Sequence, residues 1–338
     1  MKKIYLLAFV LLLSVTGSRA QQKAVYNQYM LNGYLLNPAL TGVENYLDVK
    51  ASYRNQWSGL AGAPASFYVS AQGPLNKEDR SSSLVSLPAR GKNAIINTLR
   101  LRSDNDFRIL KPHHGLGALV VGDKMGPESR LGASLTYAYH LPVAQQRMKL
   151  SAGFSGGFTR YRLDPSQLDF GPQADPVAGQ YYGDMVLPEI GAGLMLYGRN
   201  FYAGASAAQL FQGAINLSPN PAADPSRFHN HYFVTGGYEW KPSRELSVLP
   251  SLLLRYAPPT PVTVDVNLKV AYLRQVWGGL SYRHNNALSV LGGANVNKMV
   301  SIGYAYEVAT TSLYQYNTGS HELMIGLALH NTFAVRNR

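Results

Sequence analysis

Cysteine is absent from all 338 positions of this chain. The protein therefore has neither a disulfide framework nor an N-terminal cysteine that could carry a lipid. Beyond the first twenty residues, the sequence also lacks any apolar run that approaches the ~18 residues of a membrane-spanning helix. This excludes a helical integral membrane protein. A membrane-spanning β-strand needs only ~10 residues of alternating character, so the mean hydropathy of −0.12 remains compatible with a membrane.

The first twenty residues have the pattern of an export signal. Lys2 and Lys3 give a positive start, an almost continuous apolar stretch follows, and Ser18 and Ala20 place small residues at the −3 and −1 positions of a cleavage site. We expect residues 1–20 to form a signal peptide that is removed. Export without lipid attachment follows.

Acidic residues are scarce, with 19 Asp and Glu against 31 Lys and Arg, and the formal net charge is +12. Removal of the three basic residues of the leader lowers it to about +9. Such a balance can indicate nucleic acid, an acidic membrane surface or an acidic partner. For an exported protein we expect basic loops and a basic lumen, and no nucleic-acid partner. The 23 tyrosines, against 11 phenylalanines and 3 tryptophans, favour rings with a polar tip, which are typical of membrane interfaces.

Alternation of apolar and polar residues is the dominant periodicity. It is clearest over residues 47–57, 131–141 and 262–272, each of which has one apolar and one polar face, and it recurs with small residues on the second face over 323–329. These segments are long enough to cross a bilayer, whereas strands of soluble sandwiches are commonly about half as long.

The turn-forming clusters between such segments divide the chain into an even number of strands, as a single-chain outer-membrane barrel requires. The sequence therefore predicts an all-β fold, a transmembrane antiparallel outer-membrane β-barrel of about 14 strands. We expect them near residues 45–58, 65–75, 114–122, 131–142, 146–162, 185–198, 200–210, 229–241, 246–257, 262–273, 276–284, 287–294, 298–307 and 321–331.

The predicted domains are a signal peptide (1–20), an N-terminal segment (21–44), the barrel (45–331) with an insertion (76–113), and a C-terminal tail (332–338). The N-terminal segment is too aromatic to be a free tail, and we expect it to pack into the barrel or against its periplasmic rim. Its apolar residues include Tyr26, Tyr29, Met30, Tyr34, Leu35, Leu36 and Pro38.

Loop lengths predict an orientation. With both termini in the periplasm, the long loops at 163–184, 211–228 and 308–320 are extracellular and the alternate connections are mostly short turns. The exception is the insertion 76–113, which carries eight Lys or Arg against four Asp or Glu. We predict that it lies on the periplasmic side and meets a periplasmic partner.

Several catalytic patterns occur without the context that they need. Gly153–Gly157 matches G-x-S-x-G, but strand alternation continues through Tyr161, where a nucleophile elbow would turn into a helix. Gly115-Leu-Gly117 and Gly191-Ala-Gly193 begin like dinucleotide fingerprints without the third glycine or a helix. We interpret these glycines as small residues within barrel strands.

The histidines form no complete metal-binding set in the sequence. No spaced carboxylate or cysteine accompanies the pair His113–His114 or the pair His229 and His231. His321 opens a zincin-like motif, but Ile325 stands where its second histidine would be. We expect no enzyme, and no catalytic, cofactor-binding or metal-ligating residue.

Charged residues within the predicted strands fall on their polar faces. A Lys or Arg that faced lipid at mid-depth would cost ~2–4 kcal/mol, so we expect these side chains to point into the lumen. Cross-strand ion pairs there would give a plugged platform, whereas a charged constriction would give a water channel, and both interpretations stay open. The residues are Lys50, Arg54, Arg255, Asp265, Lys269 and Glu307.

Motifs in the same order along nearly the whole mature chain resemble the PorP/SprF family. One departure is Glu307, where the family usually has Asp, and another is the insertion 76–113. The motifs are Tyr26-Asn-Gln-Tyr-Met30, Leu36-Asn-Pro-Ala39-Leu-Thr-Gly42, Tyr53-Arg-Asn-Gln-Trp57-Ser-Gly59, Gly62-Ala-Pro64, Val121-Gly-Asp123-Lys-Met-Gly126-Pro127, Leu135-Thr-Tyr-Ala-Tyr139, Trp277-Gly-Gly279-Leu-Ser-Tyr-Arg283, Ile302-Gly-Tyr304-Ala-Tyr306-Glu307 and Tyr316-Asn-Thr-Gly319-Ser-His321-Glu322.

The resemblance implies an outer-membrane barrel of the type IX secretion system, which serves protein export, retention of a secreted adhesin or gliding. It implies as partners outer-membrane lipid and either periplasmic lipoprotein components of that system or a secreted surface protein with a sorting domain. A second hypothesis is a transporter or channel for small or hydrophobic solutes, because a barrel of this strand number can enclose a lumen. A third, an outer-membrane hydrolase, rests only on Gly153–Gly157.

Overall fold

The computed structural model describes the N-terminal segment from residue 26 and nearly all of the predicted barrel. The predicted signal peptide, the predicted tail and most of the predicted insertion lie outside the described residues. The described ranges are 26–79, 110–145, 147–167, 184–211, 214–215, 226–227, 229–243, 245–273 and 275–330.

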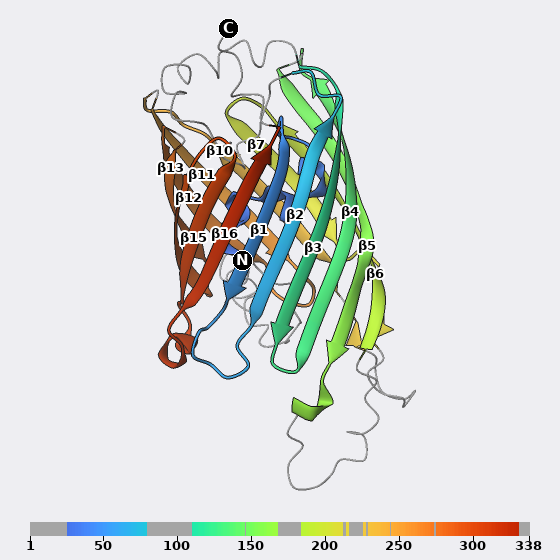
Figure 1. The fold of residues 1–338 in the computed structure, drawn as a ribbon, viewed down its shortest axis with the longest axis vertical. Helices are drawn as coiled ribbons and strands as arrows, with labels where there is room; N and C mark the ends of the chain where they lie inside the picture. The colour runs from blue at the N-terminus through green and yellow to red at the C-terminus, as the bar shows by residue number, and fades with distance from the viewer. Residues whose placement is uncertain are drawn as a thin grey trace, which may run out of the picture.

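Fourteen antiparallel strands close into a barrel, in which the first strand pairs with the last (Figure 1). This confirms the predicted fold class and strand number. The barrel strands are β1 Leu47–Asn55, β2 Ala65–Leu75, β3 His113–Met125, β4 Glu128–Val143, β5 Met148–Leu163, β6 Asp184–Tyr197, β7 Phe201–Ala208, β10 His231–Tyr238, β11 Leu246–Tyr256, β12 Thr263–Tyr272, β13 Val276–Arg283, β14 Ala287–Asn295, β15 Val300–Ala309 and β16 Ser320–Leu329.

The strands differ from the predicted ones mainly around the β3–β4 hairpin. The polar stretch 123–130, expected as a turn, continues both strands, and Asp123 pairs with Arg130 across them. The reversal needs only Gly126, at φ +55°, and Pro127, because a two-residue hairpin requires positive φ that glycine adopts without cost. A second difference is a small separate sheet of β8 (Ala214–Ile215) and β9 (Ser226–Arg227), within a stretch expected to be only loop.

Within the described residues, helical structure is limited to short 3₁₀ turns. Three of them, η1 Asn27–Met30, η2 Gly33–Leu35 and η3 Pro38–Leu40, lie in the N-terminal segment, and η5 Pro165–Gln167 and η7 Ser312–Tyr316 lie in connections between strands. No helix within the described ranges is long and apolar enough to cross a membrane.

The two ends of the barrel differ. The connections that follow β1, β3, β5, β7, β11, β13 and β15 share one end, which we call the long-loop end because it carries the three predicted long loops (Figure 1). The connection between β2 and β3 lies at the opposite end, the insertion end, with the start of β1 and the close of β16. The grouping of long loops at one end is as the sequence predicted.

The outer face of the wall is apolar. On β4, for example, Leu131, Leu135 and Tyr137 are exposed, and the residues between them are more buried. Exposed aromatic rings gather near both ends of the strands, as interface girdles do. Near the long-loop end they include Tyr53, Phe67, Tyr232, Tyr256 and Tyr282, and near the insertion end Tyr137, Tyr139, Tyr238, Trp240 and Tyr272.

Candidate functional site

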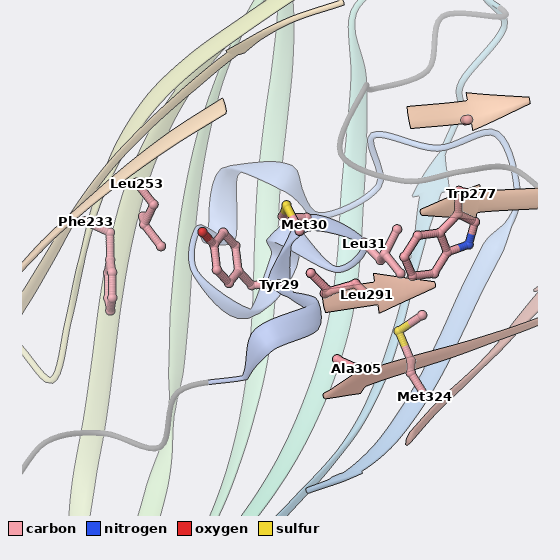
Figure 2. Close-up of a cluster of buried hydrophobic side chains, with 10 residues drawn as sticks. Tyr29, Met30, Leu31, Phe233, Leu253, Trp277, Leu291, Ala305 and Met324 are labelled. Atoms are coloured by element: carbon pink, nitrogen blue, oxygen red, sulfur yellow. The ribbon is translucent and has the colours of Figure 1, made fainter. Parts of the chain in front are cut away.

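The N-terminal segment occupies the lumen. Residues 26–46, here called the plug, run inside the barrel as three 3₁₀ turns, and nearly all of their side chains are buried (Figures 1 and 2). A loop inside a barrel must satisfy its backbone polar groups without water, so its stability depends on partners from the wall. Of the two positions expected for this segment, the described residues take the lumen.

One side of the wall holds the plug through hydrogen bonds to its backbone. Ser151 of β5 donates to the carbonyl oxygen of Ala39 at 2.5 Å, and Asn37 donates from the plug to the Leu194 carbonyl oxygen of β6 at 3.0 Å. His140 and His113 bond to the next carbonyl oxygens, those of Thr41 at 2.8 Å and Gly42 at 3.1 Å. These bonds fix the register of residues 37–42 against β3–β6.

Inward-facing glycines make this close approach possible. A β-carbon at Gly153 would lie 2.4 Å from the carbonyl oxygen of Pro38, and one at Gly115 would lie 2.0 Å from that of Thr41. One at Gly193 would lie 2.1 Å from the side-chain oxygen of Asn37. Any side chain there would occupy the position of the plug. We call the part of the wall formed by β3–β7 the glycine wall.

Tyrosine hydroxyls of the plug also bond to the wall. Tyr34 and Thr136 of β4 share a hydrogen bond of 2.9 Å, and Asn267 of β12 donates to the Tyr29 hydroxyl oxygen at 2.7 Å. Burial raises the pKa of Tyr34 to about 12 and raises the pKa of Tyr29 further. Both hydroxyls therefore stay protonated over the physiological pH range.

The opposite side of the wall packs against the plug with apolar side chains. Tyr29, Met30 and Leu31 project from η1 and the residue after it into a cluster of buried side chains (Figure 2). The wall contributes Phe233, Leu253, Ala271, Trp277, Leu291, Ala305 and Met324, from β10 through β16. We call this part of the wall, β10–β16, the charged wall, because the ionic network described next lies on it.

A carboxylate of β16 binds the start of η1. Glu322 is fully buried and accepts hydrogen bonds from the backbone N–H groups of Asn27 at 2.6 Å and Gln28 at 3.3 Å. Gln28 returns a bond from its side chain to the Glu322 carbonyl oxygen at 3.1 Å. A charged acceptor for two otherwise free N–H groups is a strong anchor.

Buried ion pairs form a chain that runs along the charged wall from β11 to β15 and ends on β1. Asp265 of β12 pairs with Arg255 of β11 at 2.9 Å and with Arg283 of β13 at 3.4 Å. Arg283 also pairs with Glu307 of β15 at 3.2 Å, and Glu307 pairs with Arg54 of β1 at 2.6 Å. Arg54 and Glu307 have only 1% and 2% of their side chains exposed, so this pair is shielded from solvent near the long-loop end of the barrel.

The structure confirms the prediction that the strand charges face inward. Lys50 pairs with Asp48, and Lys269 donates to the Met30 carbonyl oxygen at 3.4 Å. The other four predicted charges lie in the ionic chain. Two important partners, Arg283 and Glu322, were not predicted as inward charges, although alternation places Arg283 on the same face as Trp277 and Glu322 on the same face as Met324.

A second polar cluster lies toward the insertion end. His113 and His140 stack with ring centroids 4.2 Å apart, and Lys149 lies between His113, at 3.1 Å, and Asp79, at 2.6 Å. Lys77, in the connection after β2, donates to the Val43 carbonyl oxygen. Burial, with the nearby Lys149 charge, lowers the pKa of Lys77 to about 7. The start of the predicted insertion is thus tied to the plug.

The G-x-S-x-G motif and the histidine pair His113–His114 lie within regular barrel strands. Gly153–Gly157 runs straight through β5, so the predicted continuation of the strand through Tyr161 is confirmed. His113 and His114 face opposite sides of β3, since His113 is buried and His114 bonds the exposed Tyr137 at 2.7 Å. Within the described residues, no group of three or more His, Cys, Asp or Glu side chains could hold a metal ion.

The plug therefore contacts the wall around its circumference. Its hydrogen bonds reach β2–β7, β12, β13 and β16, and its apolar cluster adds β10, β11, β14 and β15. This arrangement gives a barrel whose lumen is occupied by the plug and whose two ends are built differently.

Comparisons with known proteins give one family match and several distant likenesses. The family model described as type IX secretion system membrane protein PorP/SprF matches residues 18–327. Among solved structures, the chain is similar to the Acinetobacter baumannii outer membrane protein Omp33, with 7% identity, a TM-score of 0.48, and coverage of 86% of this chain and 100% of that one. A deletion mutant of the TodX monoaromatic hydrocarbon channel has 11% identity and a TM-score of 0.43, covering 92% and 95%. No curated protein matches the chain.

Proposed function

Because this outer-membrane β-barrel belongs to the PorP/SprF family of type IX secretion system membrane proteins, we propose that it acts as a closed, non-enzymatic platform that binds partners of the system. The observation that carries the proposal is the plug, which is bonded to the wall on both sides of the lumen. A platform that binds partners at the two faces of the membrane needs no open pore.

The two ends of the barrel suggest where each class of partner binds. We propose that the insertion end faces the periplasm and meets periplasmic lipoprotein components of the secretion system, while the long-loop end meets a secreted surface protein with a sorting domain. The link from Lys77 and Asp79 to the plug and to Lys149 supports a firm attachment of the insertion, because the Lys149–Asp79 ion pair is buried and the Lys77 contact is partly buried. Protease added to intact cells should leave the segment 80–109 uncut. Cleavage there would reverse the proposed orientation.

Export underlies this placement. We propose that residues 1–20 are a signal peptide, cleaved after Ala20, so that the plug begins a few residues into the mature chain. Amino-terminal sequencing of the protein purified from outer membranes should begin at Gln21.

A deletion strain tests the proposed role. Loss of the gene should reduce the surface display or export of proteins that carry type IX sorting domains, and the full-length chain should restore it. A chain that lacks residues 80–109 should insert into the membrane but restore less secretion, and it should capture fewer periplasmic partners from detergent-solubilised membranes. Unchanged display in the deletion strain would contradict the proposal.

The alternative, a channel for small or hydrophobic solutes, would need the plug to leave the lumen. The hydrogen bonds of Glu322 to the start of η1 and of Ser151 to Ala39 weigh against this, because a departing plug would break these buried bonds. Solute uptake into liposomes at rates above those of protein-free liposomes would favour the channel.

A further inference from the structure

The apolar outer face of the barrel has one charged region. Within the fourteen barrel strands that the structure describes, the only Lys, Arg, Asp and Glu side chains that face outward are Lys124 of β3, Arg160 and Arg162 of β5, and Asp184 of β6. They lie at the long-loop end of a continuous run of neighbouring strands (Figure 1). Because a charge that faces hydrocarbon at mid-depth is costly, their concentration at one end indicates a surface that meets a charged group.

The strand register places the basic residues beside one another. Lys124 pairs with Ser129 of β4, and Ser129 pairs with Arg162, so the two basic residues lie two strands apart in one row. Neighbouring strands are ~4.8 Å apart, which puts the backbones of these two residues about 10 Å apart. Arg160 lies two residues nearer the middle of β5 on the same face. Side chains of this length can therefore converge over Ser129.

Two of the three basic groups have no ion-pair partner among the described residues. Arg160 is paired, because it donates to Asp184 from Nε at 2.7 Å and also from a terminal nitrogen. Asp164, just after β5, accepts hydrogen bonds from two residues of η5 instead of pairing with a basic group. Lys124 and Arg162 stay without a carboxylate partner. Even with both carboxylates counted, the three basic groups leave one positive charge in excess.

The acidic side chains on the inner face of β3–β6 do not change this count on the outer face. Each of them faces the lumen side and accepts a hydrogen bond there. The acceptors are Asp123, Glu128 and Glu189, and their donors are Ser66, Arg130 and Thr159. Because the strand backbone lies between them and the outer face, an anion that approaches from outside the barrel meets the basic groups first.

The surface beside the basic groups faces lipid. Leu131 lies in register with Arg160, and Leu135 and Phe158 lie outward on the same two strands, closer to their middles. Along β5 the outward side chains thus change from Phe158 to Arg160 within two residues. Such a change marks the boundary between hydrocarbon and headgroups, which is the depth of lipid phosphate groups. An acidic protein would meet the basic groups without this apolar belt, so the combination favours a lipid.

We propose that Lys124, Arg160 and Arg162 bind the phosphate of a lipid headgroup, while the acyl chains of the same lipid lie along Leu135 and Phe158. Arg and Lys form charge-assisted hydrogen bonds with phosphate oxygens, and these are stronger than neutral ones. In the orientation proposed above, the long-loop end lies in the outer leaflet, where lipid A carries such a phosphate. The site rests on that orientation for its leaflet but not on the role in secretion.

A lipid titration followed by native mass spectrometry of the purified protein tests the site, because lipids reach both ends of the barrel in detergent, whatever its orientation in the cell. The probes are monophosphoryl lipid A and the same lipid after removal of its phosphate. We expect the phosphorylated lipid to bind about tenfold more tightly, which is the contribution of a charge-assisted hydrogen bond. Equal binding of the two would overturn the inference and favour an acidic protein at the basic groups. Displacement of the lipid by excess inorganic phosphate would also overturn it, in favour of a site for the free ion.

Two double variants localise the binding. Lys124→Gln with Arg162→Gln should abolish the preference for the phosphorylated lipid. Lys241→Gln with Lys298→Gln removes the same charge from two turns at the insertion end and should leave the preference unchanged. All four side chains are exposed, so both variants should stay folded, as judged by heat-modifiable migration in gels. A preference retained in the first variant, or lost equally in both, would contradict the site.

Discussion

The two sides of the lumen hold the same plug by different means. The glycine wall brings its backbone against the plug backbone, and its contacts at Gly115, Gly153 and Gly193 have no room for a β-carbon. The charged wall stays farther away and fills the space with long side chains, including Trp277 and the ionic chain that contains Glu307. The plug, with its three short 3₁₀ turns, is thus positioned by strand backbone on the side of the glycine wall and by side chains on the side of the charged wall.

This difference has consequences for tolerance to change. Side chains can shift to absorb a substitution, whereas two backbones in contact cannot. The glycine wall should therefore be the less tolerant side. It also explains why β3–β6, each of 13 to 16 residues, form the longest and most continuous ladder in the described barrel, since a rigid surface requires unbroken pairing.

The largest effect is expected for Gly153→Val. Its added atoms would overlap the Pro38 carbonyl, so the plug must leave its position, and the cost should exceed the ~1–3 kcal/mol of ordinary overpacking. The matched control is Gly156→Val on the same strand, where the nearest atom to a β-carbon is 3.7 Å away. Heat-modifiable migration should show early unfolding only for the first variant. Equal stability of the two would remove the distinction between the walls.

Glu307→Ala should come next, with a loss of about 3–5 kcal/mol, because it leaves Arg54 and Arg283 buried with fewer partners. Glu307→Asp keeps the charge and should recover most of the stability. Urea unfolding in lipid vesicles measures both. If the aspartate variant is as unstable as the alanine variant, the chain of ion pairs does not stabilise the charged wall as described.

Leu31→Ala should cost about 2–4 kcal/mol, since it opens a cavity between the plug and Trp277 that the charged wall can only partly refill. The control is Leu135→Ala, which shortens a lipid-facing side chain that is 72% exposed. The same unfolding assay should show a clearly smaller loss for the control. A larger loss at Leu135 would mean that the plug adds little to stability.

Single cysteine substitutions should disturb the structure least. Because the chain has no cysteine of its own, a thiol reagent reports only on the substituted position. Leu31→Cys lies in the buried cluster and should resist a maleimide reagent in the folded protein, whereas Tyr316→Cys, at an exposed site of η7, should react readily. Mass spectrometry after timed labelling compares the two. Rapid labelling at position 31 would indicate that the plug leaves the lumen often.

The sequence predicted the walls better than the plug. Turn-forming clusters located every barrel strand, and alternation placed Arg54, Asp265 and Glu307 inside, because a two-residue period assigns each side chain to a face. The plug has no such period, because contacts with strands far along the chain determine the positions of its 3₁₀ turns. Its aromatic content predicted burial, but no local pattern could pair Ala39 with Ser151.

The sequence predicted the buried polar clusters only in part. The parity of Arg283 and Glu322 within their strands was visible in the sequence, but their roles depend on Asp265, Asn27 and Gln28, which are far along the chain. The stacking of His113 on His140 depends on the β3–β4 register. The paired part of β3 and β4 is longer than the sequence predicted, because Gly126 and Pro127 alone form the turn between them.

Conductance in planar lipid bilayers tests the central claim, a lumen sealed by the plug, most directly. The full-length protein should give no steady conductance above the lipid background, and a variant in which Gly115 and Gly153 are both valine should conduct if it inserts, because its plug cannot occupy the lumen. Steady, pore-like conductance of the unaltered protein would contradict the account of a closed platform.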